Sequence, residues 1–365
     1  MYDFRLLFVT WVHYDGIMRN ILAAFGFLIR LSLKQRKSYS SEYITINDES
    51  IGVDIYDPIG PSKGCILTIN GFAPLGNRDE RFLHLNSALA GIGFTVVSPH
   101  LPGFCNLQID SAHVSLIQRL TLAISHRRDL TRSGKVAVLA PSFAGGMTLI
   151  AAATAFSEHI SAICTIGTYA NVDALLDSLM LNQNADEYGR LIILRNFLHL
   201  SAGRQPRIAT AITHILHDSY FHARDPVFPD YEKTLRRTER TFLLRLREDS
   251  NFRMRHWKRI IKKSGKRRSI LAQICAMKQI KKMDVPVCLI HGCDDNVVPA
   301  SESRQLHEKF QLLGATSRLI LTPLISHGDS RRHLSDLPAA WQLAAGFAFF
   351  FKNASTDSRL PDNAR

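Results

Sequence analysis

The stretch KVAVLAPSFAGGMTLIAAATAF, from Lys135 to Phe156, places five apolar residues before a proline and a serine and then continues into a helical apolar pattern. A short apolar run followed by apolar residues at helical spacing predicts a buried strand that turns directly into a helix. Ser142 occupies the turn. It is either a nucleophile whose oxygen is carried out of the backbone, or a helix N-cap, which is a common position for serine.

Small residues around Ser142 favour a sharp turn. Such a turn crowds the residues two before and two after the serine, and these are Ala140 and Ala144. Gly145 and Gly146 follow and relieve the next contacts. The local sequence is therefore compatible with an exposed nucleophile at the tip of a strand-to-helix turn.

Strand-like and helix-like segments alternate on both sides of this stretch. Before it, the expected strands are EYITI and GVDIY, which form a hairpin, then CILTIN and FTVVS, with helices at about 81–90 and 112–126. After it come the strand ISAICTIG and, beyond residue 284, the strand VPVCLIHG, a helix at 301–313, the strand SRLILT and a helix at 334–351. This alternation predicts a mostly parallel sheet flanked by helices. Residues 169–284 have helical patterns and no convincing strand, so they are expected to form an insertion after the sixth strand.

An acid and a histidine, the other members of a serine triad, occur later in the chain in the required order. Each should follow a later strand. CLIHGCDDNVVP contains Asp294 and Asp295, and LILTPLISHGDS contains His327. His333 is the nearby competitor for the base, although it lies farther past the strand. A surface or packing role for His327 is the alternative interpretation.

Two backbone N–H groups could stabilise an oxyanion. One belongs to Phe143, at the start of the helix, where the first N–H groups have no intrahelical partner. The other belongs to Phe72, which follows the glycine of ILTINGFAPLG after an earlier strand.

Together these motifs resemble the α/β-hydrolase family. The resemblance covers residues 42–168 and 285–352 and implies Ser142 as nucleophile, His327 as general base and an aspartate that orients it. The family pattern Gly-x-x-Asp-x-x-Val-Pro matches Asp295, and Asp294 remains the alternative. Asn70 stands where the family usually has histidine before the oxyanion-loop glycine, and His100 stands where many members have aspartate.

The expected organisation has four parts. Residues 1–40 form an amphipathic N-terminal extension, residues 41–168 and 285–352 the hydrolase core, residues 169–284 a helical cap, and residues 353–365 a flexible tail. The apolar stretch between Asn20 and Arg30 is too short to cross a bilayer, which takes roughly twenty apolar residues. Arg19, Arg30 and Lys34 follow helical spacing and give a basic stripe beside an apolar face, so this helix either binds a membrane interface or packs on the protein.

The function expected from this pattern is cofactor-independent hydrolysis of carboxylic esters with an apolar acyl group, through an acyl-enzyme. An acyltransferase with the same triad and a non-catalytic binding protein are the alternatives. No metal is needed for this chemistry, and the His214, His217, Asp218 and His222 cluster is interpreted as a polar helix face. The GNRDER run, residues 76–81, is interpreted as a salt-bridged helix start.

The net charge of +13 is concentrated in one segment. Between Lys233 and Lys282 eighteen lysines and arginines face three acids, and RMRHWKRIIKKSGKRR lies within this window. A solvated helix face is the usual meaning of such a run. The expected partners are a small or lipid-like ester substrate and an anionic membrane surface, which this run of cations would bind. Nucleic acid is not expected, because few aromatic residues alternate with the cations. Six scattered cysteines without a CxxC pair indicate a reducing, cytoplasmic setting.

Overall fold

The computed structural model describes residues 4–34, 36–222, 225–263, 270–325 and 336–356, with only the backbone described for residues 4–17 and 155. Its centre is an eight-stranded sheet in the order β1-β2-β4-β3-β5-β6-β7-β8. The strands are β1 Ser40–Ile46, β2 Glu49–Tyr56, β3 Cys65–Thr68, β4 Thr95–Pro99, β5 Val136–Pro141, β6 Ile160–Ile166, β7 Val287–Gly292 and β8 Ser317–Thr322. β2 runs antiparallel to both its neighbours, and the other pairs are parallel. The predicted fold class, a mostly parallel sheet with flanking helices, is confirmed.

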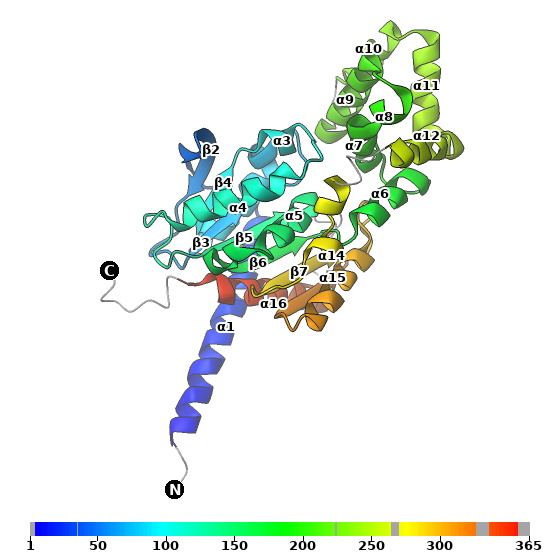
Figure 1. The fold of residues 1–365 in the computed structure, drawn as a ribbon. Helices are drawn as coiled ribbons and strands as arrows, with labels where there is room; N and C mark the ends of the chain where they lie inside the picture. Colours follow the sequence, from blue (N-terminus) through cyan, green and yellow to red (C-terminus); the bar gives the residue numbers. More distant parts are fainter. Residues whose placement is uncertain (1–3, 35, 223–224, 264–269, 326–335, 357–365) are drawn as a thin grey trace.

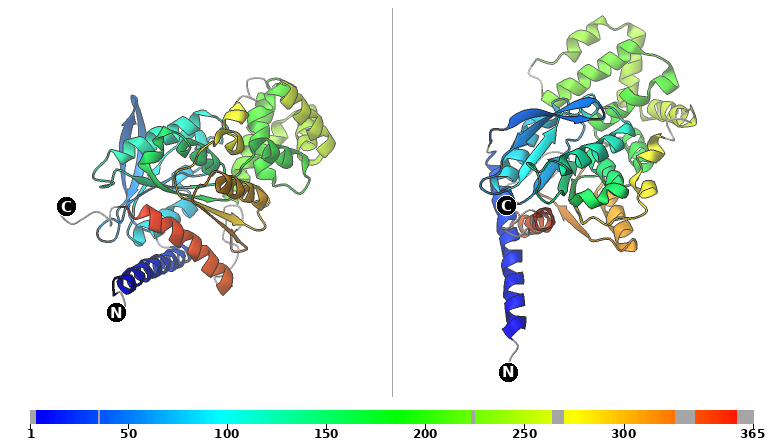
Figure 2. Two further views of the ribbon diagram at one scale, coloured as in Figure 1. Left: turned by 60° about the horizontal axis from the view of Figure 1, so that its bottom comes forward. Right: turned by 60° about the vertical axis from the view of Figure 1, so that its left-hand side comes forward.

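Helices cover both faces of the sheet (Figures 1 and 2). In the core these are α1 Phe4–Ser32, α2 Glu80–Gly91, α3 Pro102–Cys105, α4 Ala112–Ser125, α5 Ser142–Ala152, α15 Ala300–Leu312 and α16 Leu337–Ala354. α4, α5 and α15 contribute to one hydrophobic cluster, while α1, α2 and α16 contribute to a second one on the opposite face.

The central strands alternate between these two clusters. In β5, Val136 and Val138 belong to the first cluster, whereas Ala137 and Leu139 belong to the second. This alternation follows from the two-residue period of a strand, and burial on both faces explains why β5 reads as a continuous apolar run. The hairpin between β1 and β2 turns at Asn47 and Asp48, which both have positive φ and so form the two-residue turn that matches strand twist.

The insertion between β6 and β7 contains helices and no strand in its described residues, and it lies beyond one end of the sheet (Figure 1). Its helices are α6 Val172–Leu181, α7 Glu187–Phe197, α8 His199–Ala202, α9 Pro206–Phe221, α10 Phe228–Thr234, α11 Arg237–Glu248, α12 Ser250–Lys263 and α14 Ala276–Gln279.

Two buried arginines hold the insertion's helices together. Arg253 is 1% exposed and donates to the carbonyl oxygens of Met180, Leu246 and Arg247, at the ends of α6 and α11. Arg190 donates likewise to three carbonyls that follow or end α6. Helix C-termini leave carbonyls without intrahelical partners, so these guanidinium groups satisfy them.

The chain enters and leaves the insertion through one narrow connection, here called the neck, formed by residues 169–171 and 274–277. The N–H of Met277 donates to the carbonyl oxygen of Ala170 at 3.0 Å. The buried carboxylate of Glu302, on α15, accepts the N–H groups of Ala170 and Asn171 at 2.8 and 2.7 Å. The Lys309 ammonium, also on α15, donates to the Met277 carbonyl at 2.8 Å, so α15 holds both strands of the neck.

The N-terminal helix α1 packs on the body only by its second half. Ala24, Phe27 and Leu28 are buried in the second hydrophobic cluster, where the Phe27 ring lies 4.7 Å from that of Phe347 on α16. The first half of α1 projects away from the body (Figures 1 and 2). Among the described residues, no helix is long and apolar enough to span a membrane. The predicted tail falls largely on residues 357–365, which lie outside the described residues.

Candidate active site

Ser142 lies at the tip of a sharp turn between β5 and α5. Its φ is +53°, a left-handed conformation that costs a non-glycine residue about 1–2 kcal/mol. Pro141, directly before it, is extended, and α5 begins at Ser142 without an intervening loop residue. The carbonyl oxygen of Ser142 accepts a hydrogen bond from the Thr168 hydroxyl at 3.0 Å, which ties the turn to the end of β6.

The small residues after Ser142 are required by close packing. A Cβ on Gly145 would lie 2.7 Å from the Thr168 hydroxyl oxygen and 2.8 Å from the Ala140 carbonyl oxygen. A Cβ on Gly146 would lie 2.5 Å from the ring of Tyr169, which is fully buried. Glycine at both positions allows α5 to approach the sheet closely enough to hold the turn.

The predicted oxyanion loop lies directly against this turn. A Cβ built on Gly71 would be 3.5 Å from the Cβ of Ser142. Phe72 follows Gly71 and Phe143 follows Ser142, and the rings of these two phenylalanines are stacked with centroids 4.9 Å apart. Asn70 is buried and donates from its amide to the Gly71 carbonyl at 2.8 Å, so it shapes the loop. The structure thus brings the two residues predicted to donate N–H groups together beside the Ser142 turn.

An aromatic cluster surrounds the turn. The Phe72 ring lies 5.6 Å from that of Phe104, and the Phe143 ring lies 4.7 Å from that of Tyr169. Phe104 and Tyr169 are fully buried, whereas Phe72 is partly exposed. The surroundings of Ser142 are therefore apolar on this side.

Asp295 follows β7, two strands along the sheet from β5. Its carboxylate is nearly buried, with the side chain 2% exposed, and accepts the N–H groups of Val297 and Val298 at 2.9 and 2.8 Å. Asp294 is exposed. The two adjacent aspartates therefore have different surroundings, and only Asp295 is held in a fixed orientation by the turn that follows it.

His291, in β7, is a residue that sequence analysis did not single out. It is fully buried, and its Nε2 lies 2.8 Å from the Val298 carbonyl oxygen and 3.5 Å from a carboxylate oxygen of Asp295. Its Nδ1 lies 2.6 Å from the hydroxyl of Ser303, on α15. The imidazole therefore joins β7, α15 and both ends of the Asp295 turn. The sequence offered only a histidine inside an apolar strand as a signal.

His327, the predicted base, and its competitor His333 both lie outside the described residues. β8 ends at Thr322, and it is the neighbour of β7 in the sheet. The role of His327 therefore stays a prediction from the sequence.

The GNRDER run is more than a salt-bridged helix start. Asp79 caps α2 by accepting the Arg81 N–H and also pairs with the Arg81 guanidinium at 2.8 Å. It further accepts the hydroxyl of Tyr220, at the end of α9 in the insertion. Burial alone would raise the pKa of Asp79, but the hydrogen bonds from Arg81 and Tyr220 outweigh it and lower that pKa. A contact between core and insertion is thus anchored close after the oxyanion loop.

The histidine-rich run on α9 has structural partners. The Asp218 carboxylate accepts the N–H groups of Val227 and Phe228, at the start of α10. The ring of His214 lies 4.8 Å from that of Tyr231. Within the described ranges no group of histidine, cysteine and acidic side chains is arranged to hold a metal ion.

A family model of the alpha/beta hydrolase fold matches residues 66–320, which is more than half of the chain. The chain belongs to the α/β-hydrolase family. This result confirms the family resemblance that the sequence motifs indicate. No match was found among curated protein sequences.

Solved structures of α/β hydrolases are similar in fold. A Pyrococcus horikoshii acylaminoacyl peptidase has 14% identity and a TM-score of 0.44, over 86% of this chain and 41% of the peptidase. Thermogutta terrifontis esterase 2 has 11% identity and a TM-score of 0.47, over 85% and 93% of the two chains. A 2,6-dihydroxy-pseudo-oxynicotine hydrolase has 13% identity and a TM-score of 0.46, over 88% and 69%. The chain thus spans less than half the length of the peptidase.

Proposed function

We propose that this α/β hydrolase is a serine hydrolase that cleaves carboxylic esters with an apolar acyl group through an acyl-enzyme. The observation that carries the proposal is the conformation of Ser142, whose positive φ of +53° at the tip of β5 holds a strained serine beside the Gly71 loop. Strain of this kind persists where the surrounding structure enforces it, and it concentrates at functional sites. An ordinary helix N-cap serine has an extended backbone, so that alternative is not favoured.

In the proposed reaction, Ser142 Oγ attacks the ester carbonyl while His327 takes its proton and then gives it to the leaving alcohol. Water, deprotonated by His327, then attacks the acyl-enzyme and releases the acid. The N–H groups of Phe72 and Phe143 stabilise the oxyanion in both steps. Asp295 orients His327 and stabilises the imidazolium. Its fixed, nearly buried carboxylate supports this choice over the exposed Asp294.

The aromatic cluster supports an apolar acyl group. Phe143 follows the nucleophile directly, its ring stacks on that of Phe72, and the two rings contact Phe104 and Tyr169. Burial of apolar surface contributes about 25 cal/mol per Å², so a hydrocarbon chain gains binding energy against such a wall. We propose that the helical insertion acts as the cap and covers the rest of the substrate's hydrocarbon chain.

The setting that we propose is cytoplasmic, with peripheral contact to membrane and a small or lipid-like ester as substrate. The six cysteines are scattered along the chain and form no disulfide within its described residues, which supports a reducing compartment.

Labelling with a fluorophosphonate probe tests the nucleophile. We expect the probe to modify Ser142, as mapped by mass spectrometry, and the adduct to be lost in both Ser142→Ala and His327→Ala. Turnover of a p-nitrophenyl acyl ester should fall roughly 10³-fold or more in Ser142→Ala while the circular dichroism spectrum is unchanged. Retained turnover would exclude Ser142, and absent labelling in folded protein would favour a non-catalytic binding protein.

Product analysis separates hydrolysis from acyl transfer. With a short alcohol added to the reaction, a hydrolase yields mainly free acid, whereas an acyltransferase yields mainly the new ester. The proposal of hydrolysis fails if the new ester dominates at modest alcohol concentration.

A further inference from the structure

An exposed apolar surface runs along α1 and the start of α16. Among the described side chains, three large apolar ones on α1 and one just after its end are more than half exposed: Met18 at 55%, Leu22 at 64%, Ile29 at 52% and Leu33 at 64%. On α16, Leu337 is 75% and Trp341 53% exposed, and the Trp341 ring lies 5.7 Å from that of Phe25. These residues are called the α1–α16 face below. Contiguous apolar surface of this kind marks a site of association with a protein or a membrane.

The α1 helix has three distinct faces. At 3.6 residues per turn, the exposed positions 18, 22, 29 and 33 fall on one stripe. Ala24, Phe27 and Leu28 face the opposite way and are buried. The basic stripe of Arg19, Arg30 and Lys34 is about a quarter turn from the exposed apolar stripe. An apolar stripe with cations along its flank is the pattern of a helix that lies in a membrane interface.

The projecting half of α1 extends the same helix away from the body (Figures 1 and 2). Its sequence, FRLLFVTWVHYDGI, contains apolar and aromatic residues at most positions. Residues 4–17 at about 1.5 Å each reach roughly 20 Å, less than the bilayer core, and no described helix qualifies to span it. Such a segment can lie in an interface, where Trp and Tyr side chains are favoured.

We propose that the α1–α16 face docks this protein on the surface of an anionic lipid bilayer. Residues 16–37 contain five lysines and arginines and no acid, so this end of the molecule complements anionic headgroups. A second copy of the chain fits less well. A two-fold interface would pair the same surface from each copy and so bring two basic stripes together.

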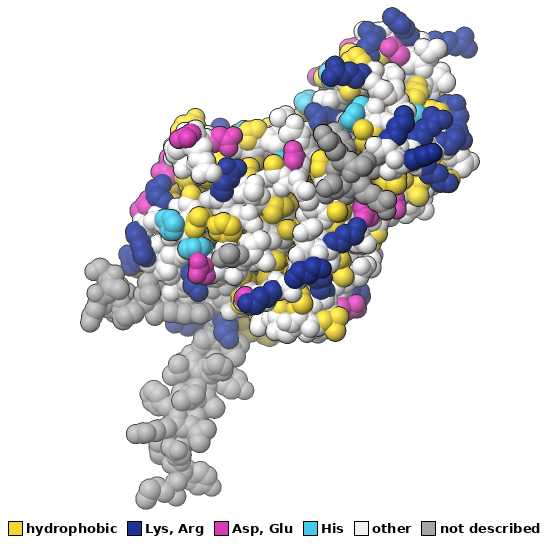
Figure 3. Space-filling model, viewed as in Figure 1, with side chains coloured by type: hydrophobic (Ala, Val, Ile, Leu, Met, Phe, Trp, Pro, Cys, Tyr) yellow, Lys and Arg dark blue, Asp and Glu magenta, His cyan; other side chains and the backbone are white. Residues whose placement is uncertain are grey.

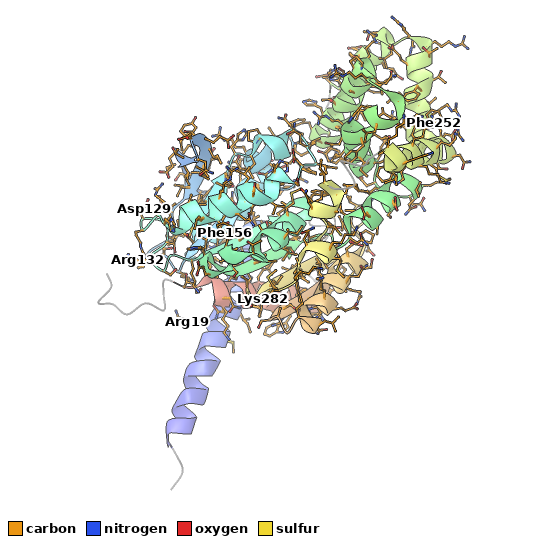
Figure 4. All side chains as sticks on the ribbon, viewed as in Figure 1. Arg19, Asp129, Arg132, Phe156, Phe252 and Lys282 are labelled. Atoms are coloured by element: carbon orange, nitrogen blue, oxygen red, sulfur yellow. The ribbon has the colours of Figure 1, made fainter. Side chains whose placement is uncertain are left out.

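The basic surface of the insertion is a separate feature. Figure 3 shows dark blue side chains gathered over α11 and α12, and Figure 4 places Arg19 and Phe252 at opposite ends of the molecule. One flat bilayer in contact with α1 would therefore leave α12 away from the membrane. The docking assigned here does not depend on the catalytic role of Ser142.

Co-sedimentation with vesicles tests the surface. We expect full-length protein to sediment with vesicles of equal parts phosphatidylcholine and phosphatidylglycerol, and less with phosphatidylcholine alone or in high salt. Leu22→Glu/Ile29→Glu should weaken binding roughly tenfold or more, because two exposed apolar side chains become anions. Leu312→Glu, at a position 88% exposed on α15, is the matched control and should bind normally. Turnover of a soluble ester should be the same in both variants, which separates this inference from the proposed function.

Fluorescence gives a second test that needs no charge change. In a Trp11→Phe background, lipids with brominated acyl chains should quench Trp341, whereas Trp11→Phe/Trp341→Phe should show little quenching because Trp257 is only 3% exposed.

Three outcomes would overturn the proposal. The first is binding that survives Leu22→Glu/Ile29→Glu but is lost in Lys258→Glu/Lys262→Glu, which would place the contact on α12. The second is no sedimentation with either vesicle. The third is a dimer in analytical ultracentrifugation that Leu22→Glu/Ile29→Glu converts to monomer, which would mean that a second copy covers the face.

Discussion

The left-handed backbone of Ser142 predicts a reversal in the order of two substitutions. Glycine normally destabilises a protein by about 0.5–1 kcal/mol relative to alanine, because it loses more conformational entropy on folding. At φ +53° alanine retains the left-handed penalty of about 1–2 kcal/mol, whereas glycine does not. Ser142→Gly should therefore be more stable than Ser142→Ala. Both variants should lack esterase activity, so the comparison tests conformation alone.

Ser111 provides the matched control. It precedes α4 with φ −70° and ψ −21°, and its side chain makes no capping hydrogen bond. There Ser111→Gly should be less stable than Ser111→Ala. The unfolded-state entropy difference between glycine and alanine is common to both sites and cancels, so the two comparisons should differ by the left-handed penalty, about 1–2 kcal/mol.

Equilibrium unfolding in urea, followed by tryptophan fluorescence, measures all four variants. Midpoints at equal slope report the differences in the free energy of unfolding. If alanine is the more stable substitution at both positions, Ser142 does not occupy the left-handed conformation in solution. The structural argument for an exposed nucleophile would then fail, whether or not the protein hydrolyses esters.

Three further predictions concern the packing, orientation and titration of buried groups. Gly145→Ala puts a Cβ within 2.8 Å of two oxygens, so it should lower the free energy of unfolding in urea by about 1–3 kcal/mol and also lower kcat/KM. Gly52→Ala is the control and should be near neutral, because its Cβ meets nothing nearer than 3.7 Å. His291→Asn should lower kcat roughly tenfold with little change in KM, because it loosens the turn that orients Asp295; unchanged kcat and pH profile would contradict this role. Burial, reinforced by two neighbouring guanidinium groups, lowers the pKa of His256 in the folded protein. The unfolded chain therefore binds the proton more readily, so the contribution of neutral His256 to stability is full above the unfolded pKa of about 6.5 and is lost as the pH falls below that value. Thermal melts between about pH 8 and pH 5 should show this loss, and His256→Asn should flatten it.

The sheet was predictable from the sequence because each central strand is buried on both faces. β5 and β7 therefore appear as short apolar runs, and the turn chemistry after them is local: Ser142 and Asp295 can be found by their neighbours in the sequence. The end of each parallel strand lies at one edge of the sheet, so residues after these strands converge there.

Other features depend on contacts between distant segments and had no local signal. Arg253 lies in a run that typically indicates a solvated helix face, yet it is buried because the ends of two other helices need donors. The bond between Tyr220 and Asp79 joins residues 141 positions apart in the chain. The α1 helix was expected either to pack on the body or to face a membrane, and only the structure shows that its second half packs while a separate apolar stripe stays exposed.

The neck has a consequence for how such a protein can diversify. Because the N–H of Met277 is bonded to the Ala170 carbonyl at 3.0 Å and Glu302 fixes the adjoining backbone, the core meets the insertion as a loop that is already closed. The entropy of closing a loop grows only slowly with its length, by about 0.6 kcal/mol per doubling. Segments of very different size and sequence can therefore be exchanged at this position by recombination or by design while the Ser142 turn keeps its geometry.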